Sequence, residues 1–280
     1  MILDDTTFDH AFGHPHVDIL GVDLSAVNMN RTLELVEKWM GAQKSAYICM
    51  TGVHGVMEAQ SKPELRRALN EALINAPDGM PMSWIGWLQG HKQMDRVYGP
   101  DFMANLCRIS AGKGYRHYLY GGQPGVAAAL KNALEKRFPG LQIVGTFTPP
   151  FRSLTQDEEN DLLIDVQNAK PDILWVGLST PKQECFMAEY VGRLGVPLLV
   201  GVGAAFDFHT GRLHDSPNWI KRAGLQWLHR LMQDPRRLWK RYLFNNARFI
   251  GRIAPQLLQL RRHEHQHTCA GETSPSSTKP

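Results

Sequence analysis

Residues 171–184 read PDILWVGLSTPKQE, and the character of the chain changes halfway along this segment. The first half is a continuous apolar run, which is typical of a strand buried on both faces of a parallel sheet. The second half is small and polar, with Pro181 placed where a helix can begin. Thr180, Lys182 and Gln183 therefore follow the carboxyl end of a buried strand, which is where open α/β sheets bind their ligands.

The same alternation of apolar runs and helical segments recurs over the first two thirds of the chain. It predicts further strands at residues 17–22, 46–51, 73–76, 115–120, 141–146 and 196–202, and helices at 30–40, 126–138 and 155–169. We therefore expect an α/β fold, a Rossmann-like, doubly wound parallel sheet flanked by helices, over residues 17–211.

The strand pattern stops near residue 212, and the rest of the chain reads differently. Two helices are predicted at 217–233 and 235–253, which makes residues 212–262 a helical appendage. Residues 263–280 are rich in His, Ser, Thr and Pro and are expected to be a disordered tail.

Charge is distributed unevenly between these parts. The whole chain has a net charge of +4, but residues 212–262 carry 12 Lys and Arg against 2 Asp, and the remainder has a net charge of −6. A basic appendage attracts phosphates, whether of nucleic acid, nucleotide diphosphates or anionic lipid headgroups. Its last helix interleaves Trp239 and Tyr242 with arginines, a pattern that fits a membrane surface better than nucleic acid. The alternative is a helix packed on its own domain or on a second subunit of a homo-oligomer.

Several classes of protein are disfavoured by what the sequence lacks. The acidic start has no apolar signal region, and no stretch of about 18 uncharged apolar residues could span a bilayer. The 4 cysteines are scattered without a CxxC pair, which indicates reduced thiols in a cytoplasmic protein. A dinucleotide-dependent oxidoreductase would need a glycine fingerprint that is missing. No DxD motif is present to hold Mg²⁺ or Mn²⁺ on a sugar nucleotide, so we expect neither metal nor cofactor.

Asp78 and Arg96 are candidates for chemistry, each with a structural alternative. Asp78 follows a short buried strand, and Asp-Gly is a common turn. Its apolar neighbours would raise the pKa of its carboxyl group and suit it to act as a general base. Arg96 lies in the loop DRVYGPD at 95–101, where it either forms salt bridges or contacts a phosphate through its planar guanidinium.

Further candidates follow other strands or lie in the appendage. Gly121 and Gly122 open the turn GGQPG, which either is a tight turn or lets a nucleotide phosphate approach the backbone. Thr51 ends its strand and can donate a hydrogen bond to a ligand, while Gln183 can hold a sugar or phosphate oxygen. In the last helix Arg237 and Arg241 are four residues apart and share one side, and Arg230 on the preceding helix can join them around a diphosphate.

An ordered set of motifs carries a family resemblance. The motifs are PDG at 77–79, RVYGPD at 96–101, GGQPG at 121–125, PKQE at 181–184, GVGAAFD at 201–207, GLQWLHRL at 224–231 and DPRR at 234–237. Together, from about Val17 to Phe249, the chain resembles the WecG/TagA/CpsF glycosyltransferase family (glycosyltransferase family 26).

The resemblance implies an inverting, metal-independent glycosyltransferase. Such enzymes move a sugar from a UDP-sugar to a polyprenyl-diphosphate-linked glycan acceptor, at the cytoplasmic membrane face, in surface-polysaccharide synthesis. Asp78 matches the acid of the family motif and is implied to be the base, and Thr51 and Gln183 match family site positions. Arg96 and the C-terminal arginines are implied to face the diphosphate, and the appendage to help close the site at the membrane.

Two departures from the family pattern bear on the sugar that is transferred. The family's Thr-x-Asn is Thr-Gly-Val at 51–53, and its Gly-Tyr-Phe is Pro-Pro-Phe at 149–151. Two kinds of donor therefore stay open: an N-acetylmannosamine-type sugar, as for teichoic acid or enterobacterial antigen, or a glucose-type sugar, as for an exopolysaccharide. The non-enzymatic alternative is a basic nucleic-acid-binding or membrane-scaffold protein.

Overall fold

The computed structural model describes residues 13–42 and 44–271, and for Asn218, Arg237, Lys240, Arg241 and residues 261–271 it describes the backbone alone. The predicted α/β fold is confirmed. A six-stranded, Rossmann-like parallel sheet has the order β4-β3-β8-β7-β5-β6. Its strands are β3 (Ala46–Thr51), β4 (Ile74–Pro77), β5 (Arg116–Gly121), β6 (Gln142–Phe147), β7 (Ile173–Gly177) and β8 (Leu198–Gly201).

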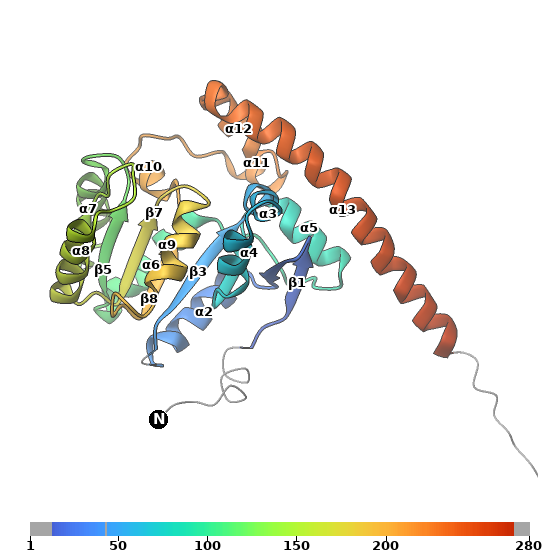
Figure 1. Cartoon of the computed structure of the whole chain (residues 1–280), viewed down its shortest axis with the longest axis horizontal. Coiled ribbons are helices and arrows are strands. Elements are labelled where there is room, and N and C mark those ends of the chain that lie inside the picture. The colour runs from blue at the N-terminus through green and yellow to red at the C-terminus, as the bar shows by residue number, and fades with distance from the viewer. Residues whose placement is uncertain (1–12, 43, 272–280) are drawn as a thin grey trace, which may run out of the picture.

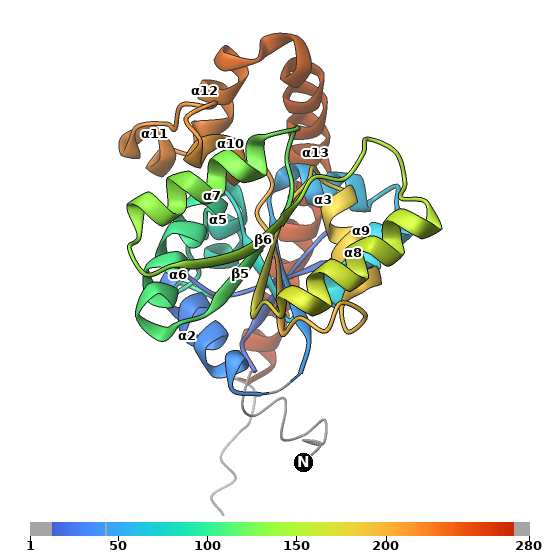
Figure 2. The same cartoon turned by 90° about the vertical axis from the view of Figure 1, so that its left-hand side faces the viewer.

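The pairing register brings the carboxyl ends of the strands to one edge of the sheet. Thr51 is paired with Pro77, Gly121 with Gly177, and Val176 with Gly201. The residues that directly follow these strands therefore lie together. Two helices of the appendage, α12 (Gln226–Gln233) and the first part of α13 (Pro235–Gly271), lie above this edge, at the top of both perpendicular views (Figures 1 and 2).

Helices cover both faces of the sheet, which makes two hydrophobic cores. The helices of the body are α2 (Met29–Met40), α3 (Val53–Ala59), α4 (Pro63–Asn70), α5 (Met80–Leu88), α6 (Gly99–Lys113), α7 (Val126–Arg137), α8 (Gln156–Ala169), α9 (Lys182–Tyr190) and α10 (Ala205–His209). One core takes Ile48 of β3 with α2, α6 and α7, and the other takes Cys49 of β3 with α3, α4 and α9. Neighbouring residues of one strand are thus buried on opposite faces, which explains the continuous apolar runs.

Local sequence signals set the starts of two helices. α8 begins with a capping box, in which the Thr155 side chain accepts from the Glu158 N–H and the Glu158 carboxylate accepts from the Thr155 N–H. α2 begins after Asn28, whose Oδ1 accepts from the N–H of Arg31 at 3.0 Å. Both helices agree with the predicted ranges to within a residue.

The single strand predicted at residues 17–22 is wrong, because the chain turns back within it. β1 (His16–Ile19) and β2 (Val22–Ser25) form an antiparallel hairpin outside the main sheet. Its two turn residues, Leu20 and Gly21, have φ of +57° and +77°. A two-residue hairpin turn of this hand needs positive φ at both positions, and a leucine gives no warning of it.

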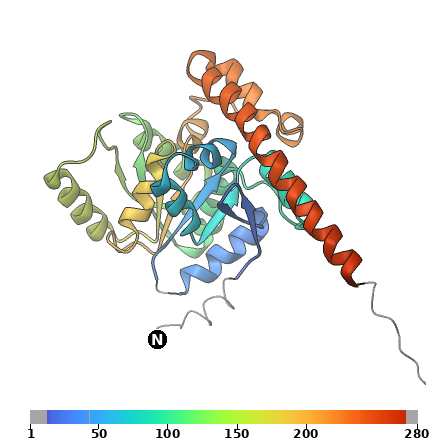
Figure 3. The same ribbon diagram turned by 45° about the vertical axis from the view of Figure 1, so that its right-hand side comes forward.

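The appendage differs from its prediction in two ways. The single helix expected at 217–233 is divided into α11 (Asn218–Arg222) and α12 (Gln226–Gln233), with Gly224 between them at φ +71°. The next helix, α13 (Pro235–Gly271), runs well beyond residue 253 and past Pro255. α13 crosses the body and extends beyond it (Figures 1 and 3).

The proposed boundaries at 211 and 262 stay predictions, and α13 is continuous across the second. Residues 272–280 of the predicted tail lie outside the described part of the chain. Among the helices that the structure describes, none is long and apolar enough to cross a membrane.

The hairpin is fastened to α13 by one side chain. The Gln256 side chain accepts from the Leu20 N–H at 3.0 Å and donates to the Asp18 backbone oxygen at 3.0 Å and to Asp18 Oδ1 at 2.6 Å. Phe249 and Ile253 of α13 are buried in the same core as the hairpin. The start of the chain and the appendage therefore hold each other in place.

Candidate active site

A cavity of about 1720 Å³ opens at the carboxyl edge of the sheet and extends under α12 and α13. Its lining includes most of the site residues predicted from the sequence: Thr51, Asp78, Arg96, Gly122, Lys182, Gln183 and Arg230. These residues lie far apart in the sequence, from Thr51 to Arg230. The strand register and the appendage therefore bring them together in one site.

Thr51 and Asp78 lie at the ends of the neighbouring strands β3 and β4. The Asp78 N–H donates to the Thr51 carbonyl oxygen at 2.9 Å, and a side chain on Gly52 would come within 2.5 Å of the Asp78 carbonyl oxygen. Thr51 is only 2% exposed, and its Oγ1 has no hydrogen-bond partner among the described residues. A buried hydroxyl at a cavity wall without a protein partner is suited to bind a ligand atom.

Gln183 is buried at the start of α9, and protein groups hold both ends of its amide. Its Oε1 accepts from the Gly203 N–H at 3.0 Å, and its Nε2 donates to Glu184 Oε1 at 2.9 Å. Thr180 Oγ1 donates to the same carboxylate oxygen at 2.9 Å. These bonds tie α9 to the loop after β8, so Gln183 shapes the cavity wall, while its predicted contact with a sugar or phosphate stays a prediction.

Gly121, which ends β5, and Gly122, which follows it, have different surroundings, and their predicted contact with a nucleotide stays a prediction. Gly121 has φ of +123°, and a Cβ there would lie 2.6 Å from the Gly177 carbonyl oxygen on β7. Its conformation and the close approach of the two strands therefore require glycine for packing. Gly122 lines the cavity, and its N–H donates to the Gly177 oxygen at 3.0 Å. Gly121 is not in the described lining.

Arg96, Lys221 and Arg230, which we call the cationic group, line the cavity where the loop before α6 meets the appendage. The Arg96 guanidinium lies 4.4 Å from the Tyr98 ring centroid and donates to Gln226 Oε1 at 3.0 Å. The Lys221 ammonium lies 4.9 Å from the same ring. Arg230 lies 5.6 Å from the Phe208 ring. Stacking of this kind holds cations in place, and the planar guanidinium groups of Arg96 and Arg230 suit an oxyanion, whereas Lys221 also forms ion pairs with carboxylates.

Tyr98 and Asp215 connect the appendage to the body. The Tyr98 hydroxyl donates to Asp215 Oδ1 at 3.2 Å, and the Lys221 ammonium forms an ion pair with Asp215. Burial, and then the charges of Asp215 and Asp78, raise the pKa of Tyr98, which keeps its hydroxyl protonated. The sequence reasoning missed Lys221 and Tyr98. Tyr98 could have been found through its place in the same loop as Arg96, but nothing in the sequence distinguishes Lys221 from the other basic residues.

Of the remaining basic candidates, Lys182 lies at the rim of the cavity, and the other two have side chains that the structure does not describe. Lys182 is exposed, and its Nζ donates to the Phe151 carbonyl oxygen at 3.3 Å, which joins α9 to the loop after β6. Arg237 and Arg241 have side chains outside the described residues. In the part of the chain that the structure describes, no group of three or more His, Cys, Asp or Glu side chains is arranged to hold a metal ion. The expectation of metal-independent chemistry rests on the sequence and stays a prediction.

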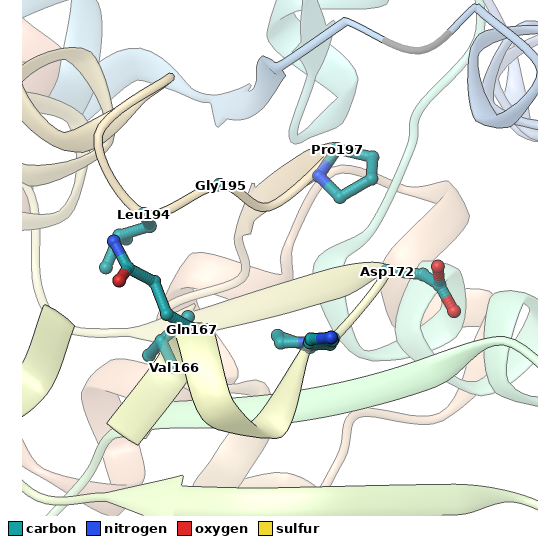
Figure 4. Close-up of a pocket in the computed structure, with 8 residues that line it drawn as sticks. Val166, Gln167, Asp172, Leu194, Gly195 and Pro197 are labelled. Carbon is teal, nitrogen blue, oxygen red and sulfur yellow. The ribbon is translucent and has the colours of Figure 1, made fainter. Parts of the chain in front are cut away.

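A second hollow, of about 330 Å³, lies at the opposite edge of the sheet (Figure 4). It is lined by Gln167, Asp172 and Pro197, among others, where β7 and β8 begin. Asp172 Oδ2 accepts from the Arg116 N–H at 2.8 Å and so joins two strands. None of the described residues in this lining was predicted as a site residue.

Comparison with known proteins identifies a family of glycosyltransferases that this chain matches. The sequence model of the Glycosyl transferase WecG/TagA/CpsF family matches residues 17–263. A Bacillus spizizenii (strain W23) protein named N-acetylglucosaminyldiphosphoundecaprenol N-acetyl-beta-D-mannosaminyltransferase is 26% identical over 205 residues, which cover 73% of this chain and 77% of the relative. A Bacillus subtilis (strain 168) protein of the same name is 27% identical over 167 residues, covering 60% of this chain and 63% of the relative.

Proposed function

The chain belongs to the WecG/TagA/CpsF family of glycosyltransferases, and we propose that it moves a sugar from a UDP-sugar to an acceptor linked to a polyprenyl diphosphate. The names of the two Bacillus relatives support the acceptor class. The observation that carries the proposal is a single cavity in which Asp78 and Thr51 lie at strand ends and the cationic group lies where the body meets the appendage.

Asp78 is the proposed general base. Its carboxylate takes the proton from an acceptor hydroxyl as the hydroxyl oxygen forms a bond to the anomeric carbon of the donor sugar. The bond from that carbon to the UDP oxygen breaks on the opposite face, the electron pair leaves with UDP, and the configuration inverts. Base assistance of this kind is typically worth about 10²–10⁴ in rate. Thr51 donates its otherwise unpartnered hydroxyl to a substrate oxygen.

The cationic group is the proposed site of a diphosphate. Negative charge grows on the leaving UDP during transfer, and fixed guanidinium and ammonium groups stabilise it without reorganising. The acceptor diphosphate offers the same chemistry, so these side chains serve one diphosphate or the other. The basic C-terminal arginines Arg237 and Arg241 are proposed to extend this group.

We place the enzyme at the inner face of the cell membrane, as a peripheral protein. Large apolar side chains of the appendage are exposed, including Trp219 at 67% and Met232 at 76%. They stand among arginines, the combination by which amphipathic helices bind anionic lipid surfaces. The donor is an N-acetylmannosamine-type or a glucose-type sugar, and the pathway one of surface-polysaccharide synthesis.

The reaction is tested by a donor screen and one variant. Several UDP-sugars are offered with a short-chain polyprenyl-diphosphate N-acetylglucosamine acceptor, and products are identified by mass. Asp78→Asn is expected to abolish turnover while UDP-sugar binding, measured by calorimetry, survives. Near-normal turnover in this variant would remove Asp78 from the mechanism, and absence of product with every UDP-sugar would refute the donor class.

A further inference from the structure

The cavity does not end at the cationic group but continues between two helix faces. α5 contributes Met80, Trp84 and Leu88, spaced four residues apart and therefore on one side of the helix. α13 contributes Tyr242, Leu243 and Ile250 to the same cavity. We call the space between these faces the α5–α13 groove.

The lining that α5 and α13 contribute to the groove is mainly apolar and partly exposed, with Asn245 and Asn246 as its polar members from α13. Among the described lining residues, neither α5 nor α13 contributes a charged side chain. Trp84 is 42% exposed, Leu88 54%, Leu243 63% and Ile250 65%. Large apolar side chains that line one cavity and are partly exposed leave hydrophobic surface in water, and such a surface marks a binding site for an apolar ligand.

The end of the groove nearest Asp78 adjoins the cationic group, which is the proposed diphosphate site. Asp78 is separated from α5 only by Gly79, so the proposed base stands at the start of one groove wall. The turn between α11 and α12 packs close to α5, because a side chain on Gly224 would come within 2.7 Å of the Trp84 ring. Gln226, next on α12, accepts from Arg96 of the cationic group. Acid, cations and apolar groove therefore adjoin one another in a single cavity.

We propose that the α5–α13 groove binds the first isoprene units of the polyprenyl diphosphate acceptor. This inference rests on the proposed function. A glycosylated polyprenyl diphosphate presents a sugar hydroxyl, then two phosphates, then a hydrocarbon chain. The cavity presents Asp78, the cationic group and the apolar groove, so each part of the ligand meets matching chemistry. Each methylene-sized group withdrawn from water favours binding roughly three- to fourfold, so even partial burial of one isoprene unit gives a tenfold preference.

The test compares two ligands that differ only in the chain. The full chain is titrated in a calorimeter with farnesyl diphosphate and with inorganic diphosphate, without membrane or detergent. Wild-type protein is expected to bind farnesyl diphosphate at least tenfold more tightly. Trp84→Ala and Leu243→Ser, on opposite walls, are each expected to reduce that preference about three- to tenfold. The matched control is Phe244→Ser, because Phe244 is the next residue on α13, is 52% exposed and lies outside the described lining.

The outcomes separate the groove from the reaction. Equal affinity of wild-type protein for the two ligands overturns the groove, whatever the enzyme transfers. A loss in Phe244→Ser as large as that in Leu243→Ser also overturns it, because the preference would then come from the outer surface of α13. A wild-type preference that is reduced only in the groove variants, in a protein that glycosylates no polyprenyl-diphosphate acceptor, supports the groove and refutes the proposed reaction instead. Thermal melts identify any variant that is unfolded. If one groove variant is unfolded, the ligand preference of the variant on the opposite wall decides whether the groove binds the chain.

Discussion

Replacing Thr51 with valine is expected to change stability and activity in opposite directions. The Thr51 hydroxyl is buried at the end of β3 and has no hydrogen-bond partner among the described residues. If a substrate oxygen is its partner, the free enzyme carries the cost of an unsatisfied buried hydroxyl until substrate binds. Valine has nearly the same shape and removes that cost together with the hydrogen bond.

The magnitudes follow from the burial of this side chain. Leaving a hydroxyl buried and unsatisfied costs about 1–3 kcal/mol, so Thr51→Val should raise the free energy of unfolding by about 1 kcal/mol. For a chain of this size that gain corresponds to an increase in Tm of roughly 2–4 °C. Loss of a substrate hydrogen bond worth about 1.5–3 kcal/mol should lower kcat/KM roughly 10- to 100-fold.

Thermal unfolding and steady-state kinetics on the same preparations provide the measurement. Thr51→Ser is the control, because it keeps the hydroxyl but loses the methyl group that lies against Gly55. It should be less stable than wild-type protein and far more active than the valine variant. A valine variant that is destabilised by 1 kcal/mol or more would show that the hydroxyl has a structural partner, and full activity would show that it has no substrate partner.

Three other perturbations give expected results with simple measurements. Gly121→Ala, at φ +123° and 2.6 Å from a carbonyl oxygen, should cost more than about 2 kcal/mol in urea unfolding, whereas Gly125→Ala, at φ +82° with nothing within 4 Å, should cost about 1 kcal/mol; equal losses would contradict the packing role. Burial lowers the pKa of His117 to about 3, so the unfolded chain binds a proton below about pH 6.5 that the folded one does not. The free energy of unfolding should therefore fall from pH 6.5 toward pH 3, by up to about 1.4 kcal/mol per pH unit, and His117→Asn should flatten this slope; an unchanged slope would assign it to other groups. Arg96→Ala should weaken calorimetric binding of UDP roughly tenfold at low salt and less at high salt, while the exposed Arg248→Ala should not, and equal effects would indicate only general attraction by the appendage.

Much of the body could be predicted because each strand is buried on both faces. Residues 46–51 read AYICMT and form β3 over the expected range, since neighbouring side chains enter opposite cores. The hairpin at the start was missed because its turn uses Leu20 at positive φ, where the sequence shows only an unbroken apolar run. The break at Gly224 was missed because a lone glycine is compatible with a helix or with its end.

The site residues at the strand ends could be predicted from the sequence, but the contacts that the appendage makes in the site could not. Thr51 ends one predicted strand and Asp78 follows another, so both were expected at one edge of the sheet. The sequence could not place Lys221 beside Tyr98, because that contact depends on the irregular path of residues 210–217 over the edge. The surroundings of Gln183 could not be predicted, since only the hydrogen bonds show that its amide is held by Gly203 and Glu184.

The hydrogen bonds between Gln256 and the β1–β2 hairpin have a consequence for folding during translation. Two of the bonded residues, Leu20 and Gln256, are 236 positions apart. At translation rates of about 5–20 residues per second, the hairpin leaves the ribosome roughly 10–50 s before its partner is made. The last strand, β8, ends at Gly201, so in the final part of that interval the sheet can fold before α13 is complete, and its strand ends are then exposed to water. Ribosome-bound intermediates stalled before and after residue 256 should therefore differ in how readily protease cuts the hairpin.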